Sequence, residues 1–348
     1  MSGVRASGDL RVGLVGLGRF GRLHAAVLAT LPGVELAAIC DPDPAALAEV
    51  GDRFGVAARH RDLTDLLAGE RIDAIFLVTP EPLHAGQALQ VVERGIPLFL
   101  EKPLATTPAE GERVLAAAEA AGVLVQLGFL LRFEPQHALL RAEIAAGRFG
   151  PLVSMRVKRN CSRTWFPTYG DRVHPVYETS IHDIDLLLWF ARQPCTSVFA
   201  IARNYSGLRY PDGCWALLQF GDGPVAMVET SWFVPNGAPA NVLTPTWHGT
   251  IDSELEIVGV ERSARLDLLE GSLAIWEPDY TARPDTAMWP EIAGTVGGAL
   301  REEDRHFLDC VRAGVPSPIA SARDALAGLR IAEAIVESAA TGREVRLD

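Results

Sequence analysis

The sequence is poor in cysteine, and its cysteines do not have the spacing of a metal or redox site. They are odd in number and scattered, without a Cys-x-x-Cys pair, at Cys40, Cys161, Cys195, Cys214 and Cys310. This pattern argues against a disulfide framework and against a zinc site, and it is typical of proteins in a reducing compartment. We therefore expect a cytoplasmic protein.

Long apolar runs and an excess of positive charge are also missing. No stretch approaches the roughly 20 apolar residues of a membrane span, and residues 1–10 lack the apolar core of a signal peptide. The formal net charge is −12, whereas nucleic acid and anionic membranes require concentrated positive charge. The sequence therefore favours a small-molecule partner and predicts neither a nucleic-acid partner nor a membrane.

The chain has 348 residues, of which 48% are hydrophobic, which is enough for two domains with buried cores. In residues 1–127, short apolar runs alternate with helix-like segments. The runs lie at 11–18, 34–41, 72–80, 96–103 and 122–129. Regular alternation predicts an α/β Rossmann domain, a doubly wound parallel sheet whose ligands bind beyond the carboxyl ends of the strands.

The pattern changes in residues 128–348. A helix-like stretch near 134–147 and a final helix near 322–340 flank alternating strand patterns at 152–159, 214–221, 224–234 and 253–260. The spacing of these strands is typical of hairpins. We expect an α+β domain with a largely antiparallel open sheet, which binds the substrate and forms an oligomer.

A glycine-rich turn follows the first predicted strand. It reads GLGRFG and contains Gly16, Gly18 and Gly21. Glycines at this spacing permit a tight turn, close approach of a pyrophosphate and close helix packing. Asp41 ends the second strand, where a carboxylate can bind both ribose hydroxyls and would repel a 2′-phosphate. The pattern predicts an NAD site that also includes Arg19 and Phe20 of the same turn.

Residues 176–189 read VYETSIHDIDLLLW, an apolar run of helical length that carries several ionisable side chains. They are Glu178, His182, Asp183 and Asp185. At spacings of four and three, Glu178, His182 and Asp185 would share one face of an α-helix. Three interpretations are open: a carboxylate–histidine metal site, an acid/base pair, or a helix entry whose acids cap backbone amides while the histidine sits in the core.

An ordered set of motifs resembles the glucose-fructose oxidoreductase and inositol dehydrogenase family (Gfo/Idh/MocA). In chain order the motifs are GLGRFGRLHA at 16–25, VTPEPLH at 78–84, EKPLA at 101–105, GFLLRF at 128–133 and the helix that carries His182. The resemblance covers nearly the whole chain. It argues against a metal site, because hydride transfer to a nicotinamide needs no metal when a lysine and a histidine manage the proton.

The resemblance implies further contacts with the cofactor. Thr79, Pro80 and His84 would lie along the bound dinucleotide. Glu101 and Lys102 match the first two residues of the family's Glu-Lys-Pro motif, at the nicotinamide end. These residues join the glycine turn and the ribose carboxylate in the expected NAD site.

The resemblance also implies the catalytic residues. Lys102 would point at the reacting hydroxyl or carbonyl, and the peptide bond to Pro103 is often cis. The family's second-domain helix usually reads Asp-x-x-x-His, in which the histidine exchanges the substrate proton. His182 matches that histidine, whereas Glu178 replaces the aspartate and is longer by one methylene. We expect an NAD-dependent dehydrogenase that oxidises a secondary hydroxyl of a sugar, polyol or cyclitol, with the proton passing to Lys102 and His182.

Residues 159–177 are rich in Arg, Trp, Tyr and His and provide candidates for substrate contact. Besides Lys102, Glu178 and His182, the candidates are Arg159, Trp165, Tyr169 and His174. The aromatic residues and His174 are equally consistent with loop packing. Basic side chains also cluster here, at Arg156, Lys158, Arg159, Arg163 and Arg172. They fit either an anionic substrate or a solvated strand face paired with nearby acids.

Two rival functions and an assembly prediction complete the interpretation. The rivals are a redox-neutral enzyme with tightly bound NAD, such as a sugar oxidoreductase or an NAD-dependent glycosidase, and a non-catalytic dinucleotide-sensing regulator. The exposed face of the second sheet, with Trp215, Leu217 and Trp232, would be an aggregation hazard unless a partner chain covers it. We expect a homodimer or homotetramer formed by sheet-to-sheet packing.

Overall fold

The computed structural model describes residues 9–244, 247–269 and 273–347. Contacts divide the chain into two compact units. Unit 1 runs to Leu104 and adds Glu112–Gly128 and Trp289–Ala322, and unit 2 consists of Ala105–Gly111, Phe129–Met288 and the chain from Arg323 onward. Sequence analysis placed one division near residue 127, whereas the contacts return residues 289–322 to the first unit.

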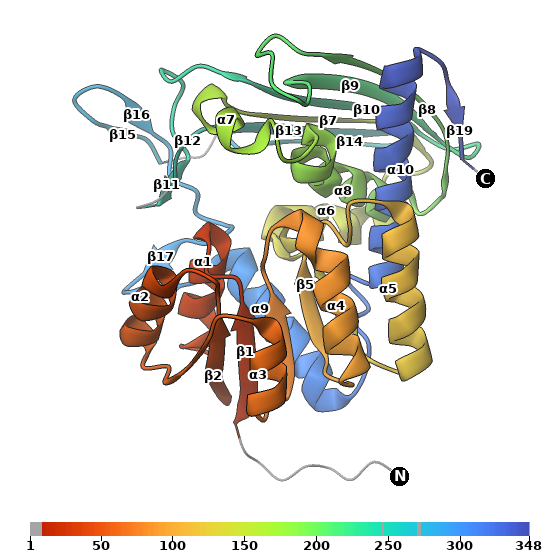
Figure 1. Cartoon of the computed structure of the whole chain (residues 1–348). Coiled ribbons are helices and arrows are strands. Elements are labelled where there is room, and N and C mark those ends of the chain that lie inside the picture. Colours follow the sequence, from red (N-terminus) through yellow and green to blue (C-terminus); the bar gives the residue numbers. More distant parts are fainter. Residues whose placement is uncertain (1–8, 245–246, 270–272, 348) are drawn as a thin grey trace. The chain divides into compact units, whose positions relative to one another are not determined.

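Unit 1 contains a parallel sheet with the strand order β3-β2-β1-β4-β5-β6, drawn in red to yellow in Figure 1. Its strands are β1 (Leu10–Val15), β2 (Val34–Cys40), β3 (Ala58–His60), β4 (Ala74–Leu77), β5 (Leu98–Glu101) and β6 (Val125–Gly128). This order is that of a dinucleotide-binding Rossmann fold, and it reverses direction between β1 and β4, where such folds bind their ligand. The predicted doubly wound fold is confirmed.

Helices connect these strands. They are α1 (Arg19–Leu28), α2 (Pro44–Phe54), α3 (Leu63–Gly69), α4 (His84–Glu93) and α5 (Pro108–Ala121), with the short 3-10 turn η1 (Glu81–Leu83) before α4. A later helix of the chain, α9 (Gly298–Ala313), also belongs to unit 1, whereas the 3-10 turn η2 (Leu130–Phe133) after β6 belongs to unit 2. Local sequence sets the ends of α2. Asp43, directly before Pro44, accepts a hydrogen bond from the Ala45 amide at the start of the helix, and Gly55 ends the helix in a left-handed conformation. A small hairpin, β17 (Glu291–Ile292) and β18 (Thr295–Val296), precedes α9.

Unit 2 is built on a seven-stranded sheet with the order β14-β13-β7-β10-β9-β8-β19. The strands are β7 (Leu152–Ser162), β8 (Cys195–Arg203), β9 (Gly213–Phe220), β10 (Val225–Val234), β13 (Ile251–Gly259), β14 (Ser263–Asp267) and β19 (Val345–Arg346). The expected largely antiparallel sheet is confirmed, with β10 and β7 as a parallel pair. Small hairpins pair β11 (Val242–Thr244) with β12 (Trp247–Gly249), and β15 (Ile275–Trp276) with β16 (Thr281–Ala282).

The helical elements of unit 2 lie along one side of its sheet, as Figure 1 shows for α8 and α10. They are α6 (Pro135–Ala145), η3 (Arg163–Trp165), α7 (Phe166–Tyr169), the π-helical turn η4 (Val176–Ser180), α8 (Ile181–Ala191) and α10 (Ala322–Thr341). Among the described residues, no helix combines the length and the hydropathy needed to cross a bilayer.

Alternation along the strands of unit 2 corrects one expectation. Trp215 and Leu217 are 38% and 48% exposed, but Trp232 is only 2% exposed. Cross-strand pairing sets Leu217 opposite Met227, so the odd-numbered residues of β10 share the open face. Trp232 has the opposite parity and packs into an aromatic core with Phe166 and Trp165. Its predicted place on the open face was wrong.

Candidate active site

The glycine turn lies at the carboxyl end of β1 and admits no side chain at two of its positions. Gly16 has φ +92°, and an added Cβ would lie 2.3 Å from the carbonyl oxygen of Val78. At Gly21 an added Cβ would lie 2.0 Å from the carbonyl oxygen of Gly16. Gly18 is different, because nothing lies within 4 Å of its added Cβ. The open space at Gly18 is where a pyrophosphate can approach the first turn of α1.

Asp41 directly follows β2 and contacts the glycine turn. Its Oδ2 accepts a hydrogen bond from the Leu17 amide at 2.7 Å, and its Oδ1 accepts from the Asp43 amide at 2.9 Å. A carboxylate has about four acceptor sites, so these two bonds leave capacity for ribose hydroxyls. Arg19 begins α1, and the ring of Phe20 packs edge-on against Trp289 at 5.6 Å.

The residues after β4 lie beside the glycine turn, where the Val78 carbonyl approaches Gly16. The hydroxyl of Thr79 donates to Oε1 of Gln87 at 2.6 Å. His84 is 1% exposed, and its ring nitrogens lie 2.7 Å from the carbonyl oxygen of Thr79 and 2.6 Å from that of Pro103. His84 therefore connects the backbone after β4 with the backbone after β5. This structural contact is separate from the predicted contact with the cofactor.

The Glu-Lys-Pro sequence forms a turn at the carboxyl end of β5. Lys102 is half-buried, and its peptide bond to Pro103 is cis. The Lys102 amide donates to Oε2 of Glu101 at 3.0 Å. Glu101 is 6% exposed, and an added Cβ at Gly128 of β6 would lie 2.5 Å from its Oε1. The carboxylate of Glu101 is thus confined within unit 1.

In unit 2, buried arginines bind Asp183 and Asp185 of the VYETSIHDID segment. Asp183 accepts two hydrogen bonds from Arg159, at 2.9 and 2.8 Å, and Asp185 accepts two from Arg132, at 2.8 and 2.6 Å. Both aspartates are 2% exposed. His182 and Asp185 lie three residues apart within α8, as the predicted common face requires, whereas Glu178 lies in the π-helical turn over Val176–Ser180, where the angular spacing differs from that of an α-helix.

Glu178 and His182 are partly exposed, whereas Asp183 and Asp185 are buried. Glu178 precedes His182 across the junction of the π-turn with α8. Burial acts to lower the pKa of Arg159, but the charge and hydrogen bonds of Asp183 outweigh that effect and raise the pKa. The charge of Glu178 adds to this rise. The two residues that the family pattern singles out are therefore more accessible than Asp183 and Asp185, as contact with a substrate would require.

The other predicted substrate contacts are largely packed in unit 2. Trp165 is 6% exposed and donates its indole N–H to the His248 carbonyl at 3.0 Å, and Tyr169 stacks on Trp232 at 5.2 Å. His174 is 7% exposed, and burial lowers its pKa to about 4. These positions favour the packing alternative that the sequence left open.

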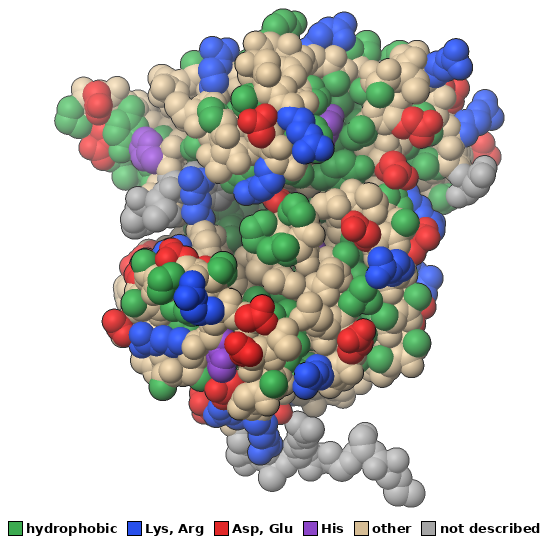
Figure 2. Space-filling model, in the orientation of Figure 1, with side chains coloured by type: hydrophobic (Ala, Val, Ile, Leu, Met, Phe, Trp, Pro, Cys, Tyr) green, Lys and Arg blue, Asp and Glu red, His purple; other side chains and the backbone are tan. Residues whose placement is uncertain are grey.

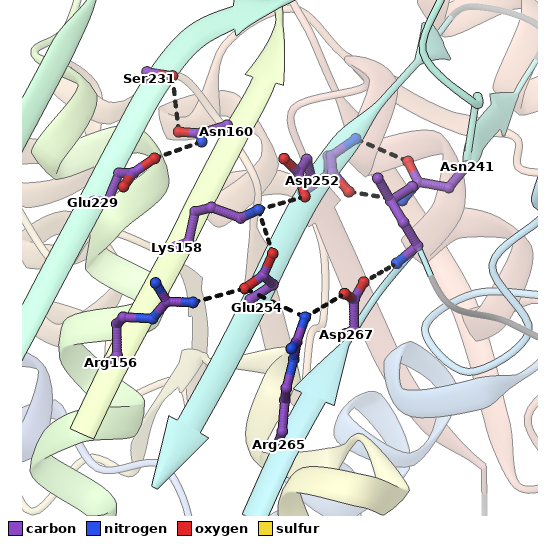
Figure 3. Close-up of polar contacts among 12 residues, drawn as sticks. Arg156, Lys158, Asn160, Glu229, Ser231, Asn241, Asp252, Glu254, Arg265 and Asp267 are labelled. Carbon is purple, nitrogen blue, oxygen red and sulfur yellow. Dashed lines mark hydrogen bonds and ion pairs between the residues drawn. The ribbon is translucent and has the colours of Figure 1, made fainter. Parts of the chain in front are cut away.

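Charged side chains on the open face of the unit 2 sheet form a ladder of ion pairs (Figure 3). Lys158 of β7 contacts Asp252 at 3.0 Å and Glu254 at 2.5 Å on β13. Arg156 contacts Glu254 at 2.9 Å. The basic residues of β7 on this face are therefore neutralised by neighbouring acids, as the second interpretation of the basic cluster expected. The face drawn in Figure 2 likewise shows basic and acidic side chains interspersed.

Sequence reasoning assigned no role to a buried histidine that contacts Glu101 of the Glu-Lys-Pro turn, or to the buried aspartate that binds this histidine. They are His24 of α1 and Asp304 of α9, both 0% exposed. Asp304 lies between Leu300 and Phe307 on the buried side of α9. An acid on the apolar stripe of an amphipathic helix is the signal that could have indicated it.

Comparison with known proteins now complements this geometry. Residues 10–129 match the model described as "Oxidoreductase family, NAD-binding Rossmann fold", and residues 141–347 match that for the family's C-terminal alpha/beta domain. The chain belongs to the Gfo/Idh/MocA oxidoreductase family. Unit 1 therefore contains its NAD-binding domain.

Individual relatives cover almost the entire chain. The protein named scyllo-inositol 2-dehydrogenase (NAD(+)) from Bacillus subtilis (strain 168) is 28% identical, over 98% of this chain and 97% of that protein. D-apiose dehydrogenase from Paraburkholderia graminis is 26% identical, over 96% and 88%. Among solved structures, GenD2 from gentamicin A biosynthesis in complex with NAD is 25% identical, with a TM-score of 0.84 and coverage of 100% of this chain and 99% of that chain.

The open space at Gly18 gives a prediction that separates cofactor binding from folding. In Gly18→Ala, the methyl group meets no protein atom within 4 Å but enters the space proposed for the pyrophosphate. We expect a melting temperature close to that of the unmodified protein and NAD affinity lowered by about tenfold or more, a loss of about 1.4 kcal/mol. Calorimetric titration with NAD measures this.

The matched control is Gly86→Ala in α4, where an added Cβ also meets nothing within 4 Å. It should leave both NAD affinity and melting temperature essentially unchanged. Unaltered NAD binding by Gly18→Ala would mean that the pyrophosphate does not lie over this turn.

Proposed function

We propose that this protein is an NAD-dependent dehydrogenase that oxidises a secondary hydroxyl of a cyclitol, or of a closely related polyol or sugar. The observation that carries the proposal is the half-buried Lys102 at the carboxyl end of β5, in the unit that matches the family's NAD-binding domain. The substrate class is supported by the two enzymes above, named for scyllo-inositol and D-apiose. Bound NAD would accept the hydride from the carbinol carbon.

Lys102 is proposed as the group that binds the reacting hydroxyl and exchanges its proton. The chain contains only two lysines, Lys102 and Lys158, among many arginines. An arginine keeps its proton, whereas a lysine can release and recover one. Lysine at residue 102 is therefore a chemical requirement of the proposed reaction rather than a generic positive charge.

His182 is proposed as the second group in this proton transfer, with Glu178 orienting the substrate or the imidazole. Both lie on the helical segment that the buried acids Asp183 and Asp185 anchor. We propose that Arg159 acts through Asp183, and that Trp165, Tyr169 and His174 shape the neighbouring loop. NAD rather than NADP is proposed because Asp41 would face a 2′-phosphate.

The redox-neutral and regulatory alternatives remain distinguishable by simple observations. Tightly held cofactor would survive gel filtration and, when reduced, absorb at the wavelength characteristic of NADH. A regulator would bind NAD but turn over no alcohol. The cytoplasmic location stays a prediction.

Substitution at the two catalytic candidates tests the proposal. Lys102→Met and His182→Asn should each lower kcat by about a hundredfold to ten-thousandfold, because each removes a proton-transfer group. NAD affinity should change little. The assay is NADH formation with scyllo-inositol, myo-inositol and a panel of polyols and aldoses.

The matched control is Lys158→Met, which removes the other lysine from the surface ladder. It should retain wild-type turnover. If Lys102→Met also retained it, Lys102 would not be the proton-exchanging group.

We also propose that the open face of the unit 2 sheet packs against a second copy of the chain. Apolar side chains on adjacent strands are exposed there: Phe199 42%, Ile201 43%, Trp215 38%, Leu217 48% and Met227 54%. They are cross-strand neighbours, since Leu217 pairs with both Phe199 and Met227. The neighbouring charged residues of β7 and β13 already neutralise one another, so this face can pack against the same face of a second copy of the protein.

Light scattering tests this assembly. The unmodified protein should be a dimer or tetramer at micromolar concentration, and Leu217→Asp should dissociate it by placing charge within the patch. Ile292→Asp, at a 69% exposed site in unit 1, is the control and should leave the molar mass unchanged. A monomeric unmodified protein would rule out the proposed contact.

A further inference from the structure

A buried histidine lies between two carboxylates, one of which belongs to the Glu-Lys-Pro turn. His24 of α1 is 0% exposed, and its ring packs against the rings of Phe20, Phe76 and Phe99. The ionisable groups that face it are Asp304 of α9 and Glu101 of β5. Such a cluster in an aromatic core is costly unless its members bind one another.

The contacts form a continuous chain from α9 to Lys102. Nδ1 of His24 lies 2.9 and 3.1 Å from the two oxygens of Asp304, and its Nε2 lies 3.4 Å from Oε1 of Glu101. The other oxygen of Glu101 accepts from the Lys102 amide at 3.0 Å. Both ends of the imidazole therefore meet carboxylates, and the second carboxylate meets the backbone of Lys102.

The charge states of His24, Asp304 and Glu101 depend on one another. Ionised carboxylates only accept hydrogen bonds, so an imidazole between two of them donates at both nitrogens as a cation. Burial acts to lower the pKa of His24, but the charge and hydrogen bond of Asp304 and the contact with Glu101 outweigh it and raise the pKa to about 9. His24 is thus a cation near neutral pH, and its positive charge faces Glu101.

Glu101 also has little freedom to turn away from these contacts. An added Cβ at Gly128 would lie 2.5 Å from Oε1 of Glu101, and Gly128 is its cross-strand partner. The carboxylate is therefore confined between β6, the imidazole and the following amide.

We propose that His24, held by Asp304, is a positioning residue that fixes the Glu101 carboxylate and, through it, the backbone from which Lys102 reaches the substrate. The inference rests on the proposed role of Lys102. Removal of His24 leaves a buried carboxylate without its cation, so Glu101 must change its position or gain a proton, and either change weakens its hold on the Lys102 amide.

The scarcity of lysine allows a direct test without substrate. Protein labelled with 15N-lysine has only two labelled backbone amides, at Lys102 and Lys158. In His24→Asn and in Asp304→Asn, the Lys102 amide signal should shift and its hydrogen exchange should accelerate by about tenfold or more, since a 1.4 kcal/mol weakening corresponds to a factor of ten. The Lys158 signal, in unit 2, should not move.

Phe307→Leu is the control for a merely structural effect. Phe307 packs on Phe76 and Phe99 in the same core, and its ring offers no hydrogen bond to Asp304 or Glu101. It should lower the melting temperature while leaving the Lys102 amide close to its unmodified shift and exchange rate. Equal effects of Phe307→Leu and His24→Asn on that amide would overturn the proposal.

The pH dependence supplies a second readout. Because the folded-state pKa of His24 lies above the ordinary value of about 6.5, the stabilisation from its cation is complete below that value and disappears as pH rises through about 9. The Lys102 amide should titrate with that midpoint. Asp304→Asn removes the negative charge that raises the pKa, so the midpoint should move to lower pH, and an unchanged midpoint would contradict the proposal.

Turnover separates this inference from the proposed function. His24→Asn and Asp304→Asn should each lower kcat on the order of tenfold to a hundredfold, as expected for a misplaced catalytic group, with NAD affinity little changed. Since both act through one contact, the double variant should lose no more than the more damaging single variant. If Lys102→Met abolished turnover while His24→Asn left both kcat and the Lys102 amide unchanged, the positioning role alone would be wrong.

Discussion

The close approach of three backbone segments at the glycine turn is the constraint on which unit 1 depends. Gly16 touches the backbone that follows β4, and Gly21 touches Gly16 itself, so neither position can carry a side chain without displacement. Helix α1 consequently begins at a fixed place above the sheet, with its first turn open to a pyrophosphate. The same placement puts His24, on the buried side of α1, against Phe99 of β5. In the proposed account, the cofactor site and the position of the Lys102 turn thus depend on the same packing of α1.

In unit 2, buried ion pairs rather than glycines fix the position of the helix that carries His182. Asp183 and Asp185 flank the helical position of His182, and each is held in a buried bidentate ion pair. Buried ion pairs are weak evidence for stability, because desolvation offsets much of the attraction, but their geometry is demanding. They fix the rotation of α8 about its axis. His182 lies on the same helix and is partly exposed.

Local signals in the sequence were sufficient for the Rossmann fold and for placing the glycine turn and Asp41 at the ends of its strands, because strand alternation and glycine spacing act over short distances. The partners of the buried acids could not be predicted in the same way. Asp304 meets His24 across 280 residues of sequence, and Arg132 meets Asp185 across 53. Pairings of this kind depend on tertiary packing, which periodicity does not encode. The misplaced Trp232 shows a related weakness, since one error of parity moves a strand residue to the opposite face.

The central claim is that hydride passes from a carbinol carbon of a cyclitol or related polyol to the nicotinamide of NAD. It is tested most directly with scyllo-inositol that carries deuterium on its ring carbons, incubated with the protein and NAD, followed by mass spectrometry of the nicotinamide and of the sugar product. The account predicts NADH that bears one deuterium per molecule and an equal amount of the ketone. NADH without deuterium, or no reduction of NAD by this or any deuterated polyol or sugar of the panel, would contradict it.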